Sequence, residues 1–259
     1  MKKTLWILLV ISLAGNLLAL GILDRTIFYK NKISVDETAF YNQGLRTSRS
    51  DLIKEADYKH LGILLGGNLV RYWYLPADVD TPLVNLGSIE EKVEATYAKL
   101  KQVVAELSPG FVIINAGFCQ IHTAVHAERN VDAAISGNLE YLRKMVAVAK
   151  AQGTVPILTS LSPVRATHLL PYTGLFERSS VKKDAENSSI SEYNAQVRTL
   201  ASDNGIPFLD FHNILANEQG QLEKEYAVTD GEHLNQKGYQ AVNAYLRRQI
   251  EKLLAEETI

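Results

Sequence analysis

Cysteine is nearly absent from this chain of 259 residues, in which Cys119 is the only one. A single thiol excludes an internal disulfide and cannot by itself form a cysteine-based zinc site, so cysteine usage does not reveal the redox compartment. An excess of one charge is also missing, because 27 Lys and Arg residues face 29 Asp and Glu residues and the formal net charge is -2. No run of like charges suggests a basic arm. Nucleic acid is therefore not an expected partner.

One long apolar run is present, at the N-terminus. Residues 4–23 contain a single polar amide, Asn16, and no charged residue. About 20 residues of helix cross the hydrocarbon core of a membrane, whereas the apolar part of a cleaved signal peptide usually has about 7 to 15. We expect residues 1–24 to form an N-terminal transmembrane helix that anchors the protein in the cell membrane, with its domain on the extracytoplasmic side. The small residues near Ala19 leave a cleaved signal peptide, and a secreted or periplasmic product, as the alternative.

The rest of the chain is organised as a polar stalk, residues 25–60, followed by one domain, residues 61–259. In the domain, short apolar runs alternate with segments of helical periodicity. The predicted strands are 61–65, 83–86, 111–115, 155–160 and 207–211, and the predicted helices are 89–107, 131–152, 190–204 and 236–255. Buried strands separated by helices predict an α/β domain with a parallel sheet. Residues 165–187 lack clear periodicity, and we interpret them as a lid.

Ligands of such sheets bind beyond the carboxyl ends of the strands, so the residues that follow each strand are the site candidates. The most informative segment is Asp230-Gly231-Glu232-His233, at the entrance of the last helix. A carboxylate that holds the Nδ1 hydrogen of a histidine directs its Nε2 lone pair outward, as a general base requires. The other segments at strand ends are Gly66-Gly67-Asn68, Gly87 and Gly117-Phe118-Cys119-Gln120.

The order and spacing of these four segments resemble the SGNH (GDSL) hydrolase family. The resemblance implies a flavodoxin-like, three-layer α/β/α sandwich whose four segments carry a nucleophilic serine, an oxyanion glycine, an oxyanion asparagine and a catalytic histidine. It implies that His233 and Asp230 are the catalytic pair and that the N–H of Gly87 is an oxyanion donor. The implied substrates are esters, such as acetylated cell-envelope sugars or lipids, processed without a metal or an organic cofactor.

Two positions depart from the family pattern. Asn68 stands where the nucleophilic serine is expected, and Cys119 stands where the oxyanion asparagine is expected. An amide nitrogen is conjugated to its carbonyl and cannot be activated by His233, which excludes acyl-enzyme chemistry at this position. Loss of an oxyanion donor costs about 10² to 10³ in turnover, and a thiol is a weak donor. We expect an impaired homologue of ester hydrolases that keeps its pocket for a glycan, an acyl chain or a partner.

Other routes to activity stay open at this point. His233 could activate water directly, or Cys119 could be a nucleophile if its thiol lies within reach of the imidazole. An active esterase, O-acetyl hydrolase or acyltransferase could also use a nucleophile from elsewhere, for which the nearby candidates are Ser88, Ser160 and Ser162. His122 and His126 are spaced as metal ligands can be on a helix, but no HExxH pattern accompanies them, and no metal site is expected.

Overall fold

The computed structural model describes residues 60–73, 75, 81–166, 178–228 and 230–259. All of them belong to one compact unit, Gly44–Ile259. The predicted membrane helix, residues 1–24, and nearly all of the stalk lie outside the described residues. Within the described part of the chain, no helix has both the length and the apolar character needed to cross a bilayer.

Parallel strands form a sheet in the order β2-β1-β3-β4-β5. Their bounds are β1 Gly62–Gly66, β2 Leu83–Asn85, β3 Phe111–Asn115, β4 Val155–Thr159 and β5 Phe208–Leu209. This order is the flavodoxin-like one, in which the chain builds outward in opposite directions from β1. The predicted α/β class and parallel sheet are confirmed, and each predicted strand overlaps an observed one.

The strands are apolar throughout because helices cover both faces of the sheet. Ile63 and Leu65 of β1 belong to the core cluster that also contains residues of α4, α6 and α7. The intervening Leu64 points to the opposite face, where it is in register with Ile113 of β3 and Ile157 of β4. All five side chains are completely buried. Continuous apolar runs, instead of alternating ones, are the sequence signature of this double burial.

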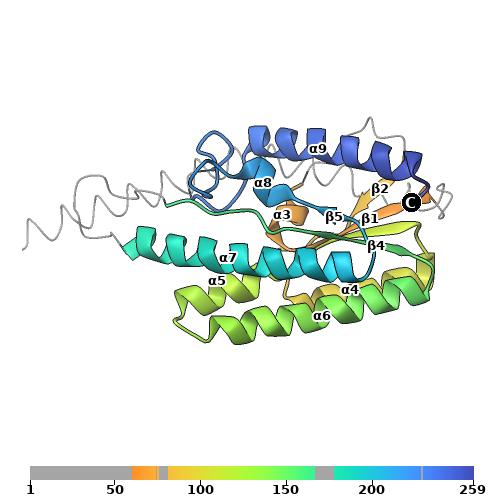
Figure 1. Ribbon diagram of the computed structural model, residues 1–259, viewed down its shortest axis with the longest axis horizontal. Helices are drawn as coiled ribbons and strands as arrows, with labels where there is room; N and C mark the ends of the chain where they lie inside the picture. Colours follow the sequence, from red (N-terminus) through yellow and green to blue (C-terminus); the bar gives the residue numbers. More distant parts are fainter. Residues whose placement is uncertain (1–59, 74, 76–80, 167–177, 229) are drawn as a thin grey trace, which may run out of the picture. The chain divides into compact units, whose positions relative to one another are not determined.

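The helices form the two outer layers (Figure 1). Figure 1 shows α4 to α7 on one side of the sheet and α8 and α9 on the other. Their bounds are α3 Asn68–Arg71, α4 Val93–Leu107, α5 Phe118–His126, α6 Val131–Ala151, α7 Arg178–Asp203, α8 Phe211–Leu215 and α9 Gln236–Ala255. The result is the α/β/α layering that the family resemblance implied.

Helix α7 is the main difference from the prediction, because it begins at Arg178 and not near residue 190. Part of the segment interpreted as a lid is therefore helical, while residues 167–177 lie outside the described residues. The buried face of α7 continues upstream from Ile190 to Glu186 and Lys183, at helical spacing. The helix prediction relied on apolar residues that recur at helical spacing. Charged residues occupy the buried face of this part of α7, so the apolar periodicity is absent there. Helices α3 and α8 are too short to produce a period.

Candidate functional site

A cavity of about 340 Å³ lies beyond the carboxyl ends of β1 and β3, where the strand order reverses. Its volume falls in the range of small-molecule sites. The wall is built by α3, the start of α5 and the loop before α9, so segments far apart in the sequence meet there. The lining residues with chemically active side chains include Asn68, Cys119, His122, Ser162, Glu232 and His233.

Asp230 and His233 form a hydrogen-bonded pair on the loop before α9. Oδ2 of Asp230 lies 2.7 Å from Nδ1 of His233, while its Oδ1 accepts the backbone N–H groups of Glu232 at 2.8 Å and of His233 at 3.0 Å. Burial would raise the pKa of Asp230, but the hydrogen bond and charge of the imidazole, together with the two backbone N–H groups, outweigh burial and lower it. The carboxylate thus accepts a hydrogen bond from Nδ1–H, which leaves Nε2 as an acceptor. This geometry is that of a general base.

The amide of Asn68 occupies the acceptor side of that imidazole. Its Nδ2 lies 3.2 Å from Nε2 of His233, and its Oδ1 accepts the backbone N–H of Glu90 at 2.8 Å. The second bond decides which way round the amide lies, so its NH₂ group donates to the imidazole. Glu90 has a φ of 50°, in the left-handed region that side chains other than glycine adopt at a cost. The base therefore meets an amide donor at the position where the family resemblance implied a nucleophilic hydroxyl.

Backbone packing explains how Asn68 reaches this position. Gly66 ends β1 with a φ of 152°, and a Cβ there would lie 2.1 Å from the carbonyl oxygen of Asn115. Only glycine allows β1 to leave the sheet so close to β3. On the other side, the hydroxyl of Tyr239 in α9 donates to the carbonyl of Leu69 at 3.0 Å. Helix α3 is thus held between the sheet and α9, with its first residue facing the imidazole.

Gly87, the predicted oxyanion donor, has a clear packing role. Its N–H donates to Oδ1 of Asn85 at 2.9 Å, and a Cβ would lie 2.5 Å from the backbone nitrogen of Arg71. The loop after β2 therefore needs glycine to approach α3. Among the residues that the structure describes, Gly87 is not one that lines the cavity. Its role as an oxyanion donor stays a prediction.

Cys119 lines the cavity as the second residue of α5. Burial raises the pKa of its thiol, and a hydrogen bond with Thr123 offsets only part of that effect. The side chain is therefore a neutral thiol near pH 7, which is a poor nucleophile and a weak hydrogen-bond donor. The positive charge of Lys92 also lowers the pKa of the thiol, but burial outweighs both effects.

The three serines considered as alternative nucleophiles have different surroundings. The hydroxyl of Ser88 accepts a hydrogen bond from Nζ of Lys99 at 2.8 Å, and that of Ser160 donates to Asp210 at 3.1 Å. Both hydroxyls are therefore engaged by other side chains. Of the three, Ser162 is the one that lines the cavity, and it is buried.

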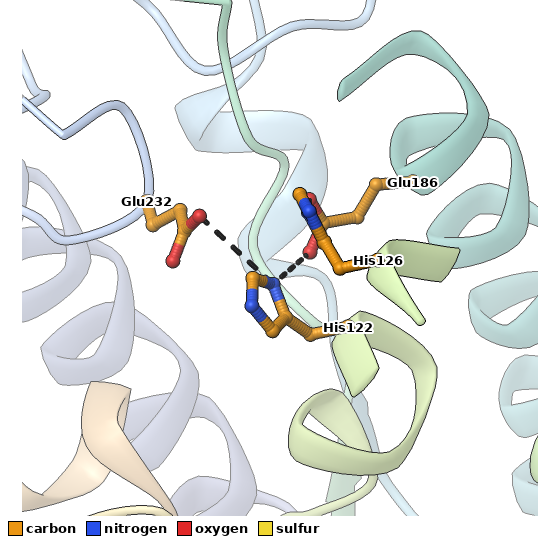
Figure 2. A group of neighbouring side chains, drawn as sticks. All are labelled: His122, His126, Glu186 and Glu232. Atoms are coloured by element: carbon orange, nitrogen blue, oxygen red, sulfur yellow. Dashed lines mark hydrogen bonds and ion pairs between the residues drawn. The ribbon is translucent and has the colours of Figure 1, made fainter. Parts of the chain in front are cut away.

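A second cluster of ionisable side chains shares the cavity wall. It consists of His122 and His126 on α5, Glu186 on α7 and Glu232 on the loop before α9, as Figure 2 shows. Nδ1 of His122 lies 2.8 Å from Oε1 of Glu186 and 3.9 Å from Oε1 of Glu232. Nε2 of His126 lies 3.2 Å from Oε2 of Glu186. All four ligand atoms lie within 4.8 Å of one another.

The charged side chains of this second cluster shift one another's pKa. Burial would raise the pKa of Glu186, but the hydrogen bond from His122 and the positive charge of Lys183 outweigh burial and lower it. The same hydrogen bond raises the pKa of His122. Nζ of Lys183 lies 3.1 Å from Oε2 of Glu186 and is also paired with Glu232. One ammonium thus faces two carboxylates.

From the sequence we noted the spacing of the two histidines but expected no metal site there, and the other members of the cluster were missed. Glu186 and Lys183 fall in the segment that was interpreted as a lid. The available signal was their spacing upstream of Ile190, which places both charged residues on the buried face of one helix. Glu232 lies inside the Asp230 to His233 motif, where it attracted no separate attention.

Comparison with known proteins identifies a family and similar folds. The model of the GDSL-like Lipase/Acylhydrolase family matches residues 43–241. The structure is similar to a GDSL-like lipase from Bacteroides thetaiotaomicron, with 24% identity, a TM-score of 0.60 and coverage of 82% of this chain and 97% of that one. It is also similar to a candidate acylhydrolase from Bacteroides fragilis, with 23% identity, a TM-score of 0.60 and coverage of 79% and 95%. No curated protein matches the chain.

At such identities the solved structures show a shared fold, whereas the family model covers well over half of the chain. The matched residues include both the end of β1, with Asn68, and the loop that carries Asp230 and His233. The chain belongs to the GDSL-like lipase/acylhydrolase family.

Proposed function

We propose that this protein is a catalytically impaired SGNH/GDSL hydrolase-like protein that keeps the family pocket to bind a glycan, an acyl chain or a partner. The observation that carries the proposal is the 3.2 Å contact between Nδ2 of Asn68 and Nε2 of His233, with Oδ1 of the same amide held by the N–H of Glu90. The nucleophile position holds a nitrogen without an available lone pair. The base therefore has no proton to take from a nucleophile at that position.

The cavity supports the binding part of the proposal. Its wall combines apolar surface with hydrogen-bonding groups, a mixture that suits an acyl chain on a sugar. The apolar residues of the wall include Leu69, Phe118 and Leu161, and the polar ones include Asn68, Asn115 and Thr123. Asn115 of β3 is itself held by Thr159 at 2.7 Å, so this part of the wall is preorganised. Pre-formed polar groups lose little entropy when a ligand binds.

Ester turnover by the full chain tests the impairment. We expect hydrolysis of p-nitrophenyl acetate by the native protein to equal that of a His233→Ala variant, because Nε2 of the imidazole contacts the amide of Asn68, which cannot be activated as a nucleophile. His212→Ala is the matched control, since His212 is a half-buried histidine on α8 that is not among the described residues lining the cavity. Turnover that disappears in His233→Ala and persists in His212→Ala would contradict the proposal, and it would also reveal activation of water by the imidazole.

An active esterase, O-acetyl hydrolase or acyltransferase is the second candidate, and the position of Ser162 in the cavity wall favours it over the other serines. A serine-directed fluorophosphonate probe separates the two candidates. We expect the native chain to stay unlabelled when its digested peptides are analysed by mass spectrometry. A labelled peptide that contains Ser162 would establish a relocated nucleophile.

A further inference from the structure

The cluster beside the pocket has the dimensions of a metal site. In a tetrahedral zinc site with bonds of about 2.0 to 2.2 Å, the ligand atoms lie about 3.3 to 3.6 Å from one another. Nδ1 of His122 lies 2.8 Å from Oε1 of Glu186 and 3.9 Å from Oε1 of Glu232, and Nε2 of His126 lies 3.2 Å from the other Glu186 oxygen, Oε2. These distances bracket the tetrahedral value. Figure 2 shows the four side chains converging from α5, α7 and the loop before α9.

We propose that His122, His126, Glu186 and Glu232 bind a divalent transition-metal ion of the zinc class. Two imidazole nitrogens and two carboxylate oxygens are a donor set that Zn²⁺ accepts readily. Mg²⁺ and Ca²⁺ prefer sites made of oxygen alone and are expected to bind weakly here. The site goes beyond the proposed function, because it does not depend on what happens at the nucleophile position.

Burial is a further reason to expect a cation at this place. The side chain of Glu186 is 0% exposed, and a carboxylate is costly to bury unless positive charge compensates it. Glu186 lies on α7 at a position where the helical period of the buried face would place an apolar residue. A carboxylate there, with two histidines and a second carboxylate around it, is typical of ligands that share a cation.

Lys183 is the competitor of the proposed ion. Its side chain is 7% exposed, and its ammonium is paired with both Glu186 and Glu232. A single positive charge neutralises one of the two carboxylates, whereas a divalent ion neutralises both. In the metal-bound form the ammonium leaves the carboxylates and the ion takes its place. Lys183 therefore sets the affinity of the site.

The ion would be part of the pocket. His122 and Glu232 line the same cavity as His233, and Glu232 precedes His233 in the chain. A metal bound there would connect α5 and α7 to the loop that carries the Asp230 and His233 pair. It would also present positive charge to the cavity, where a carboxylate or phosphate group of a ligand could coordinate it.

Zinc titration of the full chain, freed of metal by a chelator, tests the proposal. Isothermal titration calorimetry at neutral pH should show one Zn²⁺ per chain. Loss of one ligand, in His126→Ala or Glu186→Gln, should weaken binding by about tenfold or more, and the matched control His212→Ala should not change it. Lys183→Met keeps all four ligands and removes the competing ammonium. We expect that variant to bind zinc more tightly than the native chain does.

Several results would overturn the proposal. No zinc binding by the native chain would do so, including the case in which only Lys183→Met binds, because the ammonium would then be the permanent occupant. Equal binding by the native chain and a His122→Ala/His126→Ala variant would place the ion elsewhere. Co²⁺ provides a readout that does not depend on stability, since tetrahedral Co²⁺ absorbs visible light strongly. That absorption should be present in the native chain and in Lys183→Met, and its absence from both would also refute the site.

Discussion

Placing a serine at position 68 is expected to produce little esterase activity. Asn68→Ser would place a hydroxyl beside Nε2 of His233, which now contacts the asparagine amide at 3.2 Å. The imidazole of His233 would then lie next to a hydroxyl that it can activate. The oxyanion donors would still be deficient, because Cys119 supplies only a thiol and the N–H of Gly87 is bonded to Asn85 at 2.9 Å.

The expected magnitude follows from the value of one donor. An oxyanion donor is worth about 10² to 10³ in turnover, or about 2.7 to 4 kcal/mol of transition-state stabilisation. Asn68→Ser alone should therefore gain less than about 10³ over the native chain. The double variant Asn68→Ser/Cys119→Asn regains a side-chain amide as well as the nucleophile. It should exceed Asn68→Ser by about 10² to 10³.

The assay is p-nitrophenyl acetate turnover by the purified full chains, with mass spectrometry to detect an acyl-enzyme. Cys119→Asn is the matched control, because it regains the amide without a nucleophile and should stay at the native rate. A gain of more than about 10³ in Asn68→Ser alone would refute the weight given to the donor. A double variant no faster than Asn68→Ser would refute the placement of the donor at position 119.

Two further predictions concern packing and the thiol. Gly87→Ala should lower the free energy of unfolding by about 1 to 3 kcal/mol, measured in urea, because its Cβ would lie 2.5 Å from the nitrogen of Arg71. Gly137→Ala, inside α6 with nothing within 4 Å of its Cβ, should instead raise it by about 0.5 to 1 kcal/mol, and a loss at this control would contradict the packing argument. The raised pKa of Cys119 leaves little thiolate at pH 7, so iodoacetamide should alkylate it more slowly than it alkylates glutathione. The rate should climb by about tenfold per pH unit below the pKa, and fast labelling at pH 7 would show an activated cysteine.

Most of the fold could be predicted from the sequence because its signals are local. Strands such as Phe111–Asn115 are continuous apolar runs, and long helices such as Val131–Ala151 carry a clear period. The first part of α7 was missed, since Glu186 is buried through pairing with the histidines of α5 and Lys183 through pairing with Glu232. These partners lie far away in the sequence, so local apolar periodicity does not reveal this buried face.

The candidate site divides in the same way. Asp230 and His233 are three residues apart, and the turn that joins them closes with hydrogen bonds inside the motif itself. Short-range geometry of this kind is encoded locally. Asn68 and His233 are 165 residues apart, and their pairing was anticipated only through the order of the four segments, by resemblance to a family.

The amino-acid sequence by itself determined the α/β class and the strand ends beyond which a site is expected, because each depends on nearest neighbours along the chain. The departures at Asn68 and Cys119 were predicted from the sequence only through the family resemblance. Tertiary structure alone decided that the amide of Asn68 is turned toward the imidazole by the N–H of Glu90, and that α5, α7 and the loop before α9 bring two histidines and two glutamates together. Both arrangements are fixed by the packing of helices on the sheet, and the direction of a side chain across such a contact cannot be derived from spacing along the chain.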